Sequence, residues 1–554
     1  MNRNIKSVLA LMLAMLFVLS CFVACADISE SDETSAATDS GKTDGTTGDK
    51  TDGTTDSKPN DKTDGTTDGT TDDKTDGTTA DIDDGTQAPD EEETKSDEDI
   101  KKDAIAETKE ELGKIDFGKK TLAILTGSSF KGETFAEEGV VDADGGSSQL
   151  LNDAVLARNK RMEEECNLTF ESLVVADGEM VGKINTESMS PTGDFQFINY
   201  RISEAAHQAL AGRLHDWVSM GIDLDKPWWD TGTADFALLG KVFFMCGDVN
   251  YTDDNTTYVL IFNKQMQAQY SETVPNPYQT VKDWEWTLEY FNNIIQGISS
   301  ESSGDGTWDE NDTYGFVTTW EYGNTFFIGS DLRYIKNDRT MERPELALDS
   351  MMDKALLVLD LAKAIFNENN ATYMSPPGEE AKGLACFKAG RAMFYSEVAS
   401  YLPKLNKDMD AEFGILPVPK YDKAQEFYRT WTFGSGGCLS LISSIPDADA
   451  ETIGKLVQYY GILSTEEVKP VFYDVMLTTQ SVRDDESGEM LDLIFANRVY
   501  DMGLYFDSEF NLYSLFKNDV YQNTNKFSSA YKSATKKFDS KVTKLLKDLE
   551  KKTS

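Results

Sequence analysis

Short apolar runs alternate with segments of helical period through most of the chain after residue 117. Runs that predict strands lie at 120–125, 168–175, 195–200, 241–245, 258–262, 314–317 and 392–395. Between the first two, residues 150–166 place Leu151, Val155 and Met162 near helical spacing, and 204–211 repeats that pattern before the fourth run. This alternation predicts mostly parallel sheets covered by helices, an α/β class.

The first residues have a different pattern, because an apolar run at 8–23 follows Arg3 and Lys6. The run is too short for a membrane span and ends in small residues before cysteine, as in a cleaved signal peptide. The stretches ending in Cys21 and in Cys25 both resemble the bacterial lipobox. We expect residues 1–25 to be a lipoprotein signal with Cys25 lipidated, because Ala24 precedes it; Cys21 is the alternative, and a plain secretory signal with a chance cysteine is another reading.

Residues 26–112 are predicted to form a disordered acidic tether. The word Thr-Asp-Gly-Thr-Thr recurs about five times between 43 and 79, and no aromatic residue occurs from 27 to 98. Such a segment cannot bury enough apolar surface to offset the entropy lost on ordering. A stack of calcium-binding Asp-Gly turns is the alternative, but the repeats lack its apolar position. The expected location is therefore the outer face of the cell membrane of a Gram-positive-type bacterium.

The remaining part, 113–554, contains all 8 Trp and all 22 Tyr and is long enough for two lobes. The formal charge of −44 argues against a nucleic-acid or anionic-membrane partner. The chain has 2 histidines, His207 and His215, and no HExxH motif, which leaves little room for histidine-dependent hydrolysis. Carboxylate-pair catalysis is not excluded in this way.

Four widely spaced cysteines remain after the signal, at 166, 246, 386 and 438. They form no CxxC pair and have no neighbouring histidine, so they suggest no zinc site. Export permits disulfides, but the apolar surroundings of each cysteine favour buried free thiols.

Several motifs, in their order, carry a resemblance to a family. Residues 387–394 (FKAGRAMF) and 413–422 (FGILPVPKYD) resemble a paired signature of extracellular solute-binding proteins of the sugar type (family 1), which serve ABC importers. Residues 281–287 resemble the family's tryptophan-rich helix start, with Asp283 as expected N-cap, and 226–230 (KPWWD) and 151–160 match a Gram-positive lipoprotein branch.

The resemblance implies a type II periplasmic-binding-protein-like fold, in which two α/β lobes are joined by crossing strands around a ligand cleft. Lobe 1 is expected at roughly 117–247 and 394–434, and lobe 2 at roughly 248–393 and 435–554. The resemblance also implies a lipid-anchored, non-enzymatic monomer that captures a mono- or oligosaccharide for ABC permease subunits. Such a protein requires no cofactor. The alternatives are a surface glycan-active enzyme using a carboxylate pair such as Glu321 with Glu397, and a sensory or adhesive lipoprotein without a transporter.

Sugar recognition needs aromatic faces beside planar polar groups at strand ends. Trp320, Glu321 and Tyr322 follow the run at 314–317, and Trp431 precedes a glycine-rich stretch. Trp228, Trp229, Trp284 and Trp286 are instead assigned to lobe packing. The further ligand-binding candidates, each weighed against a packing role, are Ser396, Glu397, Asp248, Asn250, Ser128, Ser129, Arg201 and Ser203.

Residues 301–312 partly match a calcium-binding loop, which makes a structural calcium a candidate. Gly306 stands where that loop needs its turn. The oxygen ligands would be Glu301, Ser303, Asp305, Asp309 and Asp312. Glu at the tight first position departs from the pattern, so a plain polar loop remains the favoured alternative.

Overall fold

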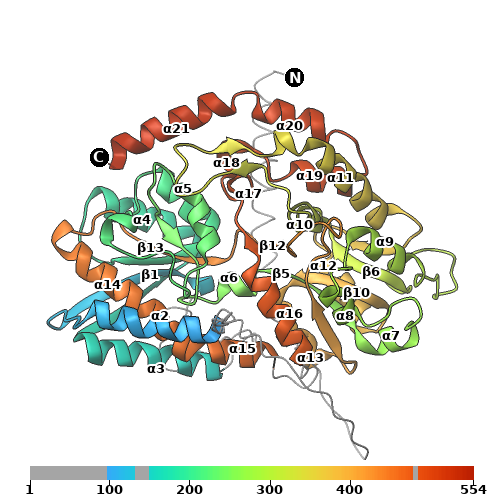
Figure 1. The fold of residues 1–554 in the computed structure, drawn as a ribbon, viewed down its shortest axis with the longest axis horizontal. Helices are drawn as coiled ribbons and strands as arrows, with labels where there is room; N and C mark the ends of the chain where they lie inside the picture. Colours follow the sequence, from blue (N-terminus) through green and yellow to red (C-terminus); the bar gives the residue numbers. More distant parts are fainter. Residues whose placement is uncertain (1–96, 131–148, 478–484, 554) are drawn as a thin grey trace, which may run out of the picture. The chain divides into compact units, whose positions relative to one another are not determined.

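The computed structural model describes residues 97–130, 149–477 and 485–553, and Lys95–Ser554 forms one compact unit (Figure 1). The signal, Cys21, Cys25 and the repeats lie outside the described residues. The last part of the predicted disordered tether is wrong, because residues Asp97–Leu112 form helix α2, which packs against the helix Asp447–Leu463. Within the described ranges, no helix combines the length and the apolar character that a membrane span requires.

The first sheet has the strand order β2-β1-β3-β13-β4. Its strands are β1 (Lys120–Gly127), β2 (Leu168–Val175), β3 (Phe197–Arg201), β4 (Phe244–Met245) and β13 (Gly437–Leu441). β1 pairs in parallel with β2 and β3, whereas β13 runs antiparallel to β3 and β4. Residues 122–127 of β1 are all buried, as expected for a strand covered on both faces. Helices of this lobe are α3 (Gln149–Cys166), α4 (Met180–Met189), α5 (Ile202–Leu210) and α14 (Asp447–Leu463).

The second sheet has the order β11-β5-β10-β6-β9. Its strands are β5 (Tyr258–Asn263), β6 (Tyr314–Thr319), β9 (Thr372–Ser375), β10 (Ala392–Val398) and β11 (Phe413–Leu416). β10 is parallel to β6 and antiparallel to β5. The helices of this part include α7 (Lys264–Gln269), α8 (Pro277–Lys282), α9 (Leu288–Gln296), α10 (Gly323–Gly329), α11 (Met352–Asn367), α12 (Glu380–Lys388), α13 (Leu402–Asp408) and α16 (Asp485–Ala496).

The chain crosses between the sheets more than once. It leaves the first sheet after β4, enters the second at β5 and returns between β11 and β13. At the return, β12 (Thr430–Trp431) pairs in parallel with β14 (Arg498–Val499). The predicted class, two α/β lobes joined by crossing segments, is therefore confirmed.

The lobe boundaries differ from those expected. Residues 394–434 contribute most of β10 and all of β11 to the second sheet, while the stretch after 435 contributes β13 and α14 to the first. The reason is the pairing of residues 437–441 with 197–201, which places the return crossing near residue 430.

Most strand predictions are confirmed, but the run at 241–245 forms only the two-residue β4. The tryptophan-rich helix start is also capped differently: Asp283 ends α8, and the side chain of Thr287 caps α9 by accepting the N–H of Tyr290 at 3.2 Å. The four cysteines named above are buried free thiols.

The C-terminal segment contacts both lobes. Its helices are α17 (Met502–Tyr505), α18 (Asp507–Phe510), α19 (Leu515–Tyr521), α20 (Phe527–Thr535) and α21 (Phe538–Thr553). α19 packs against α10 and α11 of the second lobe. α21 reaches the first lobe, where Lys552 donates to the carbonyl of Leu210 at 2.9 Å.

Candidate functional site

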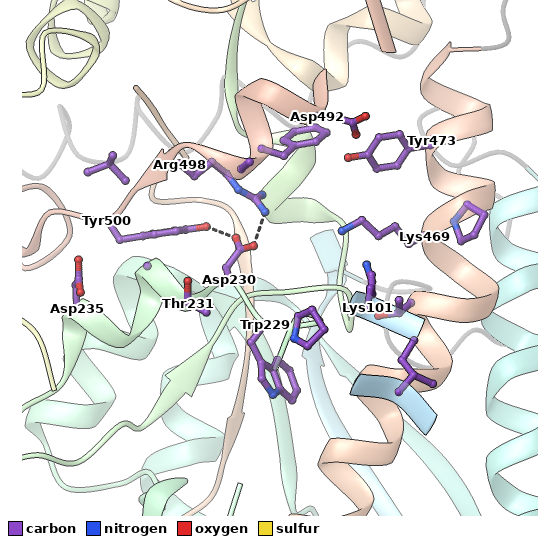
Figure 2. Close-up of a pocket in the computed structure, with 18 of the residues that line it drawn as sticks. Lys101, Trp229, Asp230, Thr231, Asp235, Lys469, Tyr473, Asp492, Arg498 and Tyr500 are labelled. Carbon is purple, nitrogen blue, oxygen red and sulfur yellow. Dashed lines mark hydrogen bonds and ion pairs between the residues drawn. The ribbon is translucent and has the colours of Figure 1, made fainter. Parts of the chain in front are cut away.

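A cavity of about 1090 Å³ opens where residues from both lobes and from two flanking helices meet (Figure 2). The 226–236 loop of the first lobe supplies Trp229 and Asp230, β14 supplies Arg498, and Tyr500 follows β14 directly. Lys101 comes from the second turn of α2 (Asp97–Leu112), and Lys469 is the first residue of α15 (Lys469–Leu477). We call this cavity the central pocket.

The 226–236 loop, which contains Trp228 and Trp229, packs closely against the backbone that follows β4. Trp228 and Trp229 both donate their indole N–H to Oε1 of Gln458, each at 3.1 Å. Gly247 has a φ of 153°, and a Cβ at that position would lie 2.3 Å from the carbonyl oxygen of Trp228. Only glycine therefore allows this approach, which positions Asp230 at the pocket wall.

Asp230 is the centre of a buried ion cluster. Arg498 donates to one of its carboxylate oxygens at 2.6 Å and the hydroxyl of Tyr500 donates to the other at 2.6 Å, as the dashed lines in Figure 2 show. The same guanidinium lies 3.4 Å from Asp253 and also contacts Asp254. Burial alone lowers the pKa of Arg498, but the carboxylates, Asp230 first, raise that pKa well above its ordinary value.

A second charged group joins α2 and α15 to the segment that leaves β4. Asp248 accepts from Lys469 at 2.6 Å, from Thr465 at 2.5 Å and from Lys101 at 3.5 Å. Burial raises the pKa of Asp248, but the charges of Lys469 and Lys101 outweigh it and leave the pKa below its ordinary value. Asp248, a sequence-predicted site residue, is thus engaged by two lysines that line the pocket. The side-chain amide of Asn250, also predicted, is buried with no hydrogen-bond partner among the described residues.

Two arginines of the second lobe line the opposite part of the pocket. Arg333 and Arg429 each lie 3.3 Å from the same oxygen, Oδ1 of Asp331. Burial lowers the pKa of Arg333, partly offset by the charge of Asp331. One carboxylate is therefore shared by two guanidinium groups.

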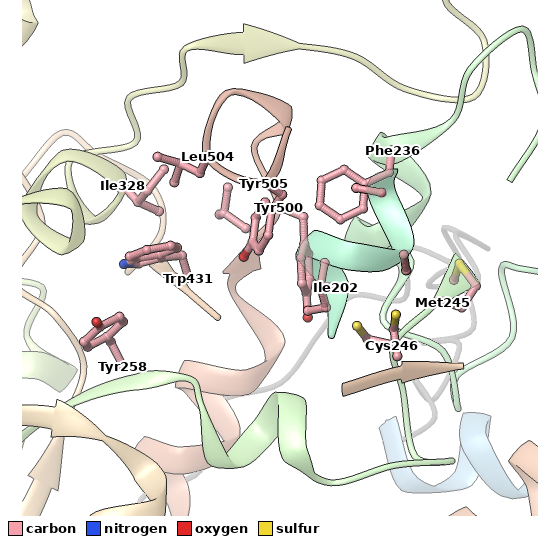
Figure 3. Packing of buried hydrophobic residues seen from close by; sticks show 14 of the residues in the cluster. Ile202, Phe236, Met245, Cys246, Tyr258, Ile328, Trp431, Tyr500, Leu504 and Tyr505 are labelled. Atoms are coloured by element: carbon pink, nitrogen blue, oxygen red, sulfur yellow. The ribbon is translucent and has the colours of Figure 1, made fainter. Parts of the chain in front are cut away.

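Several predicted ligand residues lie together in a different place, around Tyr258 at the start of β5. Trp431 stacks on Tyr258 with ring centroids 5.4 Å apart. The ring of Tyr322 packs edge-on against Tyr258, with centroids 5.8 Å apart. Trp431 is 1% exposed, and its indole N–H donates to the hydroxyl of Thr325 at 3.0 Å. Tyr505 packs between Trp431 and Phe236 of the first lobe (Figure 3). These rings pack the junction between the lobes in this structure.

The carboxylates of that group have distinct surroundings. Glu321 accepts from Lys517 at 2.9 Å and from Tyr513 at 3.3 Å, and the ammonium of Lys517 lies 4.0 Å from the ring centroid of Trp320. Burial raises the pKa of Glu397 to about 7, with the charge of Glu321 adding to the rise. Ser396, beside it, shares a 2.6 Å hydrogen bond with Thr318.

The remaining predicted residues gather at the ends of β1, β2 and β3. The carboxylate of Asp177 accepts three side-chain hydrogen bonds there. The donors are Ser129 at 2.6 Å, Arg201 at 2.7 Å and Ser128 at 3.3 Å. The backbone N–H of Ser203 donates to the carbonyl of Gly434 at 3.2 Å. The structure brings Ser128, Ser129 and Arg201 together around Asp177, and their ligand role stays a prediction.

The candidate calcium loop uses its carboxylates internally. Oε1 of Glu301 accepts from Ser303 and Gly304, each at 2.8 Å, and Asp312 accepts the N–H groups of Ser302 at 2.8 Å and Asp309 at 3.0 Å. No cluster of three or more His, Cys, Asp or Glu suited to a metal occurs within the described ranges. Calcium binding by Glu301, Ser303, Asp305, Asp309 and Asp312 therefore has no support from the side-chain arrangement.

Sequence reasoning missed most of the central pocket. It assigned Trp229 to packing, which fits the 4% exposure of that residue, but did not single out Asp230, Arg498, Tyr500 or Lys469 as a site. The alternation Arg498-Val499-Tyr500 after an apolar helix is the one local signal of a polar strand end at this place.

Comparison with known proteins gives matches among solved structures only: no family model and no curated protein matches the chain. The maltose/maltodextrin-binding domain MalE of Bdellovibrio bacteriovorus, bound to maltotriose, has a TM-score of 0.45 and 13% identity over 75% of this chain and 97% of its own. The galacto-N-biose-/lacto-N-biose I-binding protein of a Bifidobacterium longum ABC transporter has a TM-score of 0.48 and 11% identity, covering 78% and 98%. A Rhizobium etli sugar transporter protein in an open conformation has a TM-score of 0.49 and 14% identity, covering 75% and 98%.

Proposed function

We propose that this chain is the lipid-anchored binding component of an ABC importer and that it captures a mono- or oligosaccharide. The observation that carries the proposal is the central pocket, in which the half-buried ring of Tyr473 and the guanidinium groups of Arg333 and Arg429 line the wall together with Asp230. Its volume of about 1090 Å³ accommodates a small oligosaccharide. Aromatic faces and planar charged groups are the combination that sugar rings and hydroxyls need.

Lobe closure would be the capture step. The pocket takes Trp229 from the first lobe and Arg429 from the second, so a ligand in contact with both walls binds the closed arrangement more tightly than an open one. The protein itself performs no chemistry in this scheme and delivers the bound sugar to permease subunits. The anchor at Cys25 and the tether keep the receptor at high effective concentration near that membrane partner.

The binding step is tested by thermal shift and calorimetry over a panel of mono- and oligosaccharides. We expect one or more sugars to raise the melting temperature of the folded body, and Tyr473→Ala to weaken that response at least about tenfold in affinity. Trp308→Ala is the matched control, since Trp308 is 36% exposed on the 301–312 loop and does not line the pocket. If no carbohydrate shifts the melting curve, the proposal fails.

The anchor is tested separately in cells. Labelling with a palmitate analogue should mark the wild-type chain and the Cys21→Ser variant, and Cys25→Ser should abolish the label. If the Cys25→Ser protein is labelled and the Cys21→Ser protein is not, the lipidated residue is Cys21 and not Cys25.

A second candidate, a glycan-active enzyme, is favoured by one observation. Burial raises the pKa of Glu397 to about 7, so this carboxyl holds its proton to near neutral pH, as a general acid does, and Glu321 would be the second carboxylate of the pair. Incubation with a bound oligosaccharide decides between the two functions. Unchanged sugar after prolonged incubation supports binding alone, and cleavage that Glu397→Gln abolishes supports the enzyme.

A further inference from the structure

The central pocket is basic although the protein is strongly acidic. The chain has 97 Asp and Glu against 53 Lys and Arg. Among the residues that line the pocket, cationic side chains outnumber acidic ones. The acidic residues are Asp230, Asp235, Glu466 and Asp492. The cationic residues of the wall are Lys101, Lys102, Arg333, Arg429, Lys469 and Arg498.

The carboxylates near these cations do not match them one to one. Asp331 is shared by Arg333 and Arg429, and Asp248 is shared by Lys101 and Lys469. In these direct ion pairs two cations share one carboxylate, whereas Arg498 is in contact with three carboxylates, Asp230, Asp253 and Asp254. Arg333 and Arg429 line the cavity from the second lobe, and Lys101 and Lys469 line it from α2 and α15.

The acidic residues of the wall are also partly occupied. Asp230 accepts from Arg498 and Tyr500, and Glu466 accepts from Lys109. The Nε of Arg498, in contrast, is buried with no hydrogen-bond partner among the described residues. The free donor is therefore a single N–H of Arg498, and Arg333 and Arg429 are the wall cations that share one carboxylate oxygen between two guanidinium groups.

We propose that the central pocket selects a sugar that carries an oxyanion, a carboxylate or a phosphate, and that Arg333 and Arg429 bind the anionic group. This inference rests on the proposed function and names the substrate class of the same site. Arg333 and Arg429 keep 23% and 24% of their side chains exposed, so a ligand reaches them without unfolding of the wall. Their planar forks match the geometry of a carboxylate or a phosphate, and the aromatic residues nearby supply the sugar face.

The test compares ligands of matched size by calorimetry on the soluble body. The probes are digalacturonic acid against neutral galactobiose, and galactose 6-phosphate against galactose. We expect the charged member of at least one pair to bind at least about tenfold more tightly, with an affinity that falls as salt is raised. Preference within the first pair identifies a carboxylate, and preference within the second identifies a phosphate.

Variants connect that preference to the residues. Arg333→Gln and Arg429→Gln should each reduce affinity for the preferred charged sugar about tenfold to a hundredfold and leave its neutral partner nearly unaffected. Lys101→Gln, whose contact with Asp248 is 3.5 Å, is a milder substitution in case an arginine variant unfolds, and should give a smaller loss. Arg343→Gln is the control, because Arg343 pairs with Asp539 at 2.8 Å outside the pocket.

The failures can be told apart. If neutral sugars bind as tightly as their charged partners, the inference is overturned and the proposed function stands. If none of these probes and no sugar of the wider panel binds, both are overturned. Binding of a charged sugar that both arginine variants leave unchanged overturns the assignment to Arg333 and Arg429.

Discussion

Arg498 donates to Asp230 at 2.6 Å although the two residues are 268 positions apart in the sequence. The contact joins β14, in the small sheet at the return crossing, to the loop that precedes β4. The same guanidinium also pairs with Asp253 and Asp254 in the segment between β4 and β5. One arginine therefore connects three stretches of chain where the lobes meet.

Replacing Arg498 should be strongly destabilising. Its side chain is 6% exposed and those of its carboxylate partners are 17%, 0% and 12% exposed, so Arg498→Gln leaves several carboxylates buried with less compensation. Breaking a buried ion pair in this way typically costs about 3–5 kcal/mol. Urea unfolding followed by circular dichroism should show this loss in the free energy of unfolding.

Arg343→Gln again provides the matched control for Arg498→Gln. Arg343 pairs with Asp539, which is 91% exposed, and a solvent-exposed pair contributes at most about 1 kcal/mol. A loss for Arg498→Gln no larger than that of the control would show that the cluster does not stabilise the crossing.

Asp248→Asn should change the dependence of stability on pH. Because the folded pKa of Asp248 is below its ordinary value, its ionised form adds stability above the ordinary pKa. That contribution is lost as the pH falls through the folded pKa. We expect the variant to be less stable by about 2 kcal/mol at neutral pH and to approach the wild type in acid.

The measurement for Asp248 is a series of denaturant unfolding curves from neutral to acidic pH for both proteins. Asp223→Asn, a change of a half-exposed carboxylate 3.7 Å from Lys226, should show little effect across the series. A constant gap between Asp248→Asn and the wild type at every pH would contradict the ionic role.

The elements of the fold were predictable because their signals are local. The apolar run of β1 and the helical spacing of α3 lie within single segments, and both were placed within a few residues. The lobe boundaries were not, since the apolar residues of β13 fit either sheet equally well. Only the pairing of β13 with β3, more than 200 positions earlier, decides which lobe it joins.

The site was less predictable for the same reason. Ser128, Ser129 and Arg201 were singled out because each follows a predicted strand, and the structure brings them together because adjacent parallel strands end at one edge. The central pocket depends on contacts such as Lys469 with Asp248 and Arg498 with Asp230, whose partners carry no shared motif. Trp431 had the right chemistry for a sugar face, but its 1% exposure follows from neighbours contributed by β5 and the C-terminal segment.

Trp431 should contribute mainly to stability in the ligand-free protein. Trp431→Ala removes the stack on Tyr258 and leaves a cavity, so we expect a loss of about 3–5 kcal/mol in the free energy of unfolding. Trp431→Phe keeps a ring but loses the 3.0 Å bond to Thr325, which should cost about 1–2 kcal/mol. Trp284→Ala, at a 42% exposed position, is the control. An unaltered unfolding curve for Trp431→Ala would contradict its burial.

The 301–312 loop should keep its stability without calcium. Glu301 and Asp312 accept hydrogen bonds from N–H and hydroxyl groups of the loop itself, so we expect neither EDTA nor added calcium to move the melting temperature. Glu301→Gln should lower the melting temperature, because a neutral amide accepts the bonds from Ser303 and Gly304 more weakly than a carboxylate does. A rise in melting temperature with calcium that Glu301→Gln abolishes would restore the metal site.

Glu397 should make the protein less stable as the pH rises through neutrality. Burial raises its pKa from 4.5 to about 7 in the folded state, so the folded protein favours the protonated carboxyl. Stability from this group is complete below the ordinary value and is lost as the pH rises through the folded pKa. We therefore expect Glu397→Gln, which stays neutral, to be more stable than the wild type above pH 7 by about 1–3 kcal/mol.

Denaturant unfolding at mildly acidic and mildly alkaline pH measures this gain in stability, and the gain should nearly vanish at the acidic end. The exposed Glu342→Gln change is the control, and equal curves for Glu397→Gln and the wild type at alkaline pH would show that Glu397 ionises freely in the folded protein.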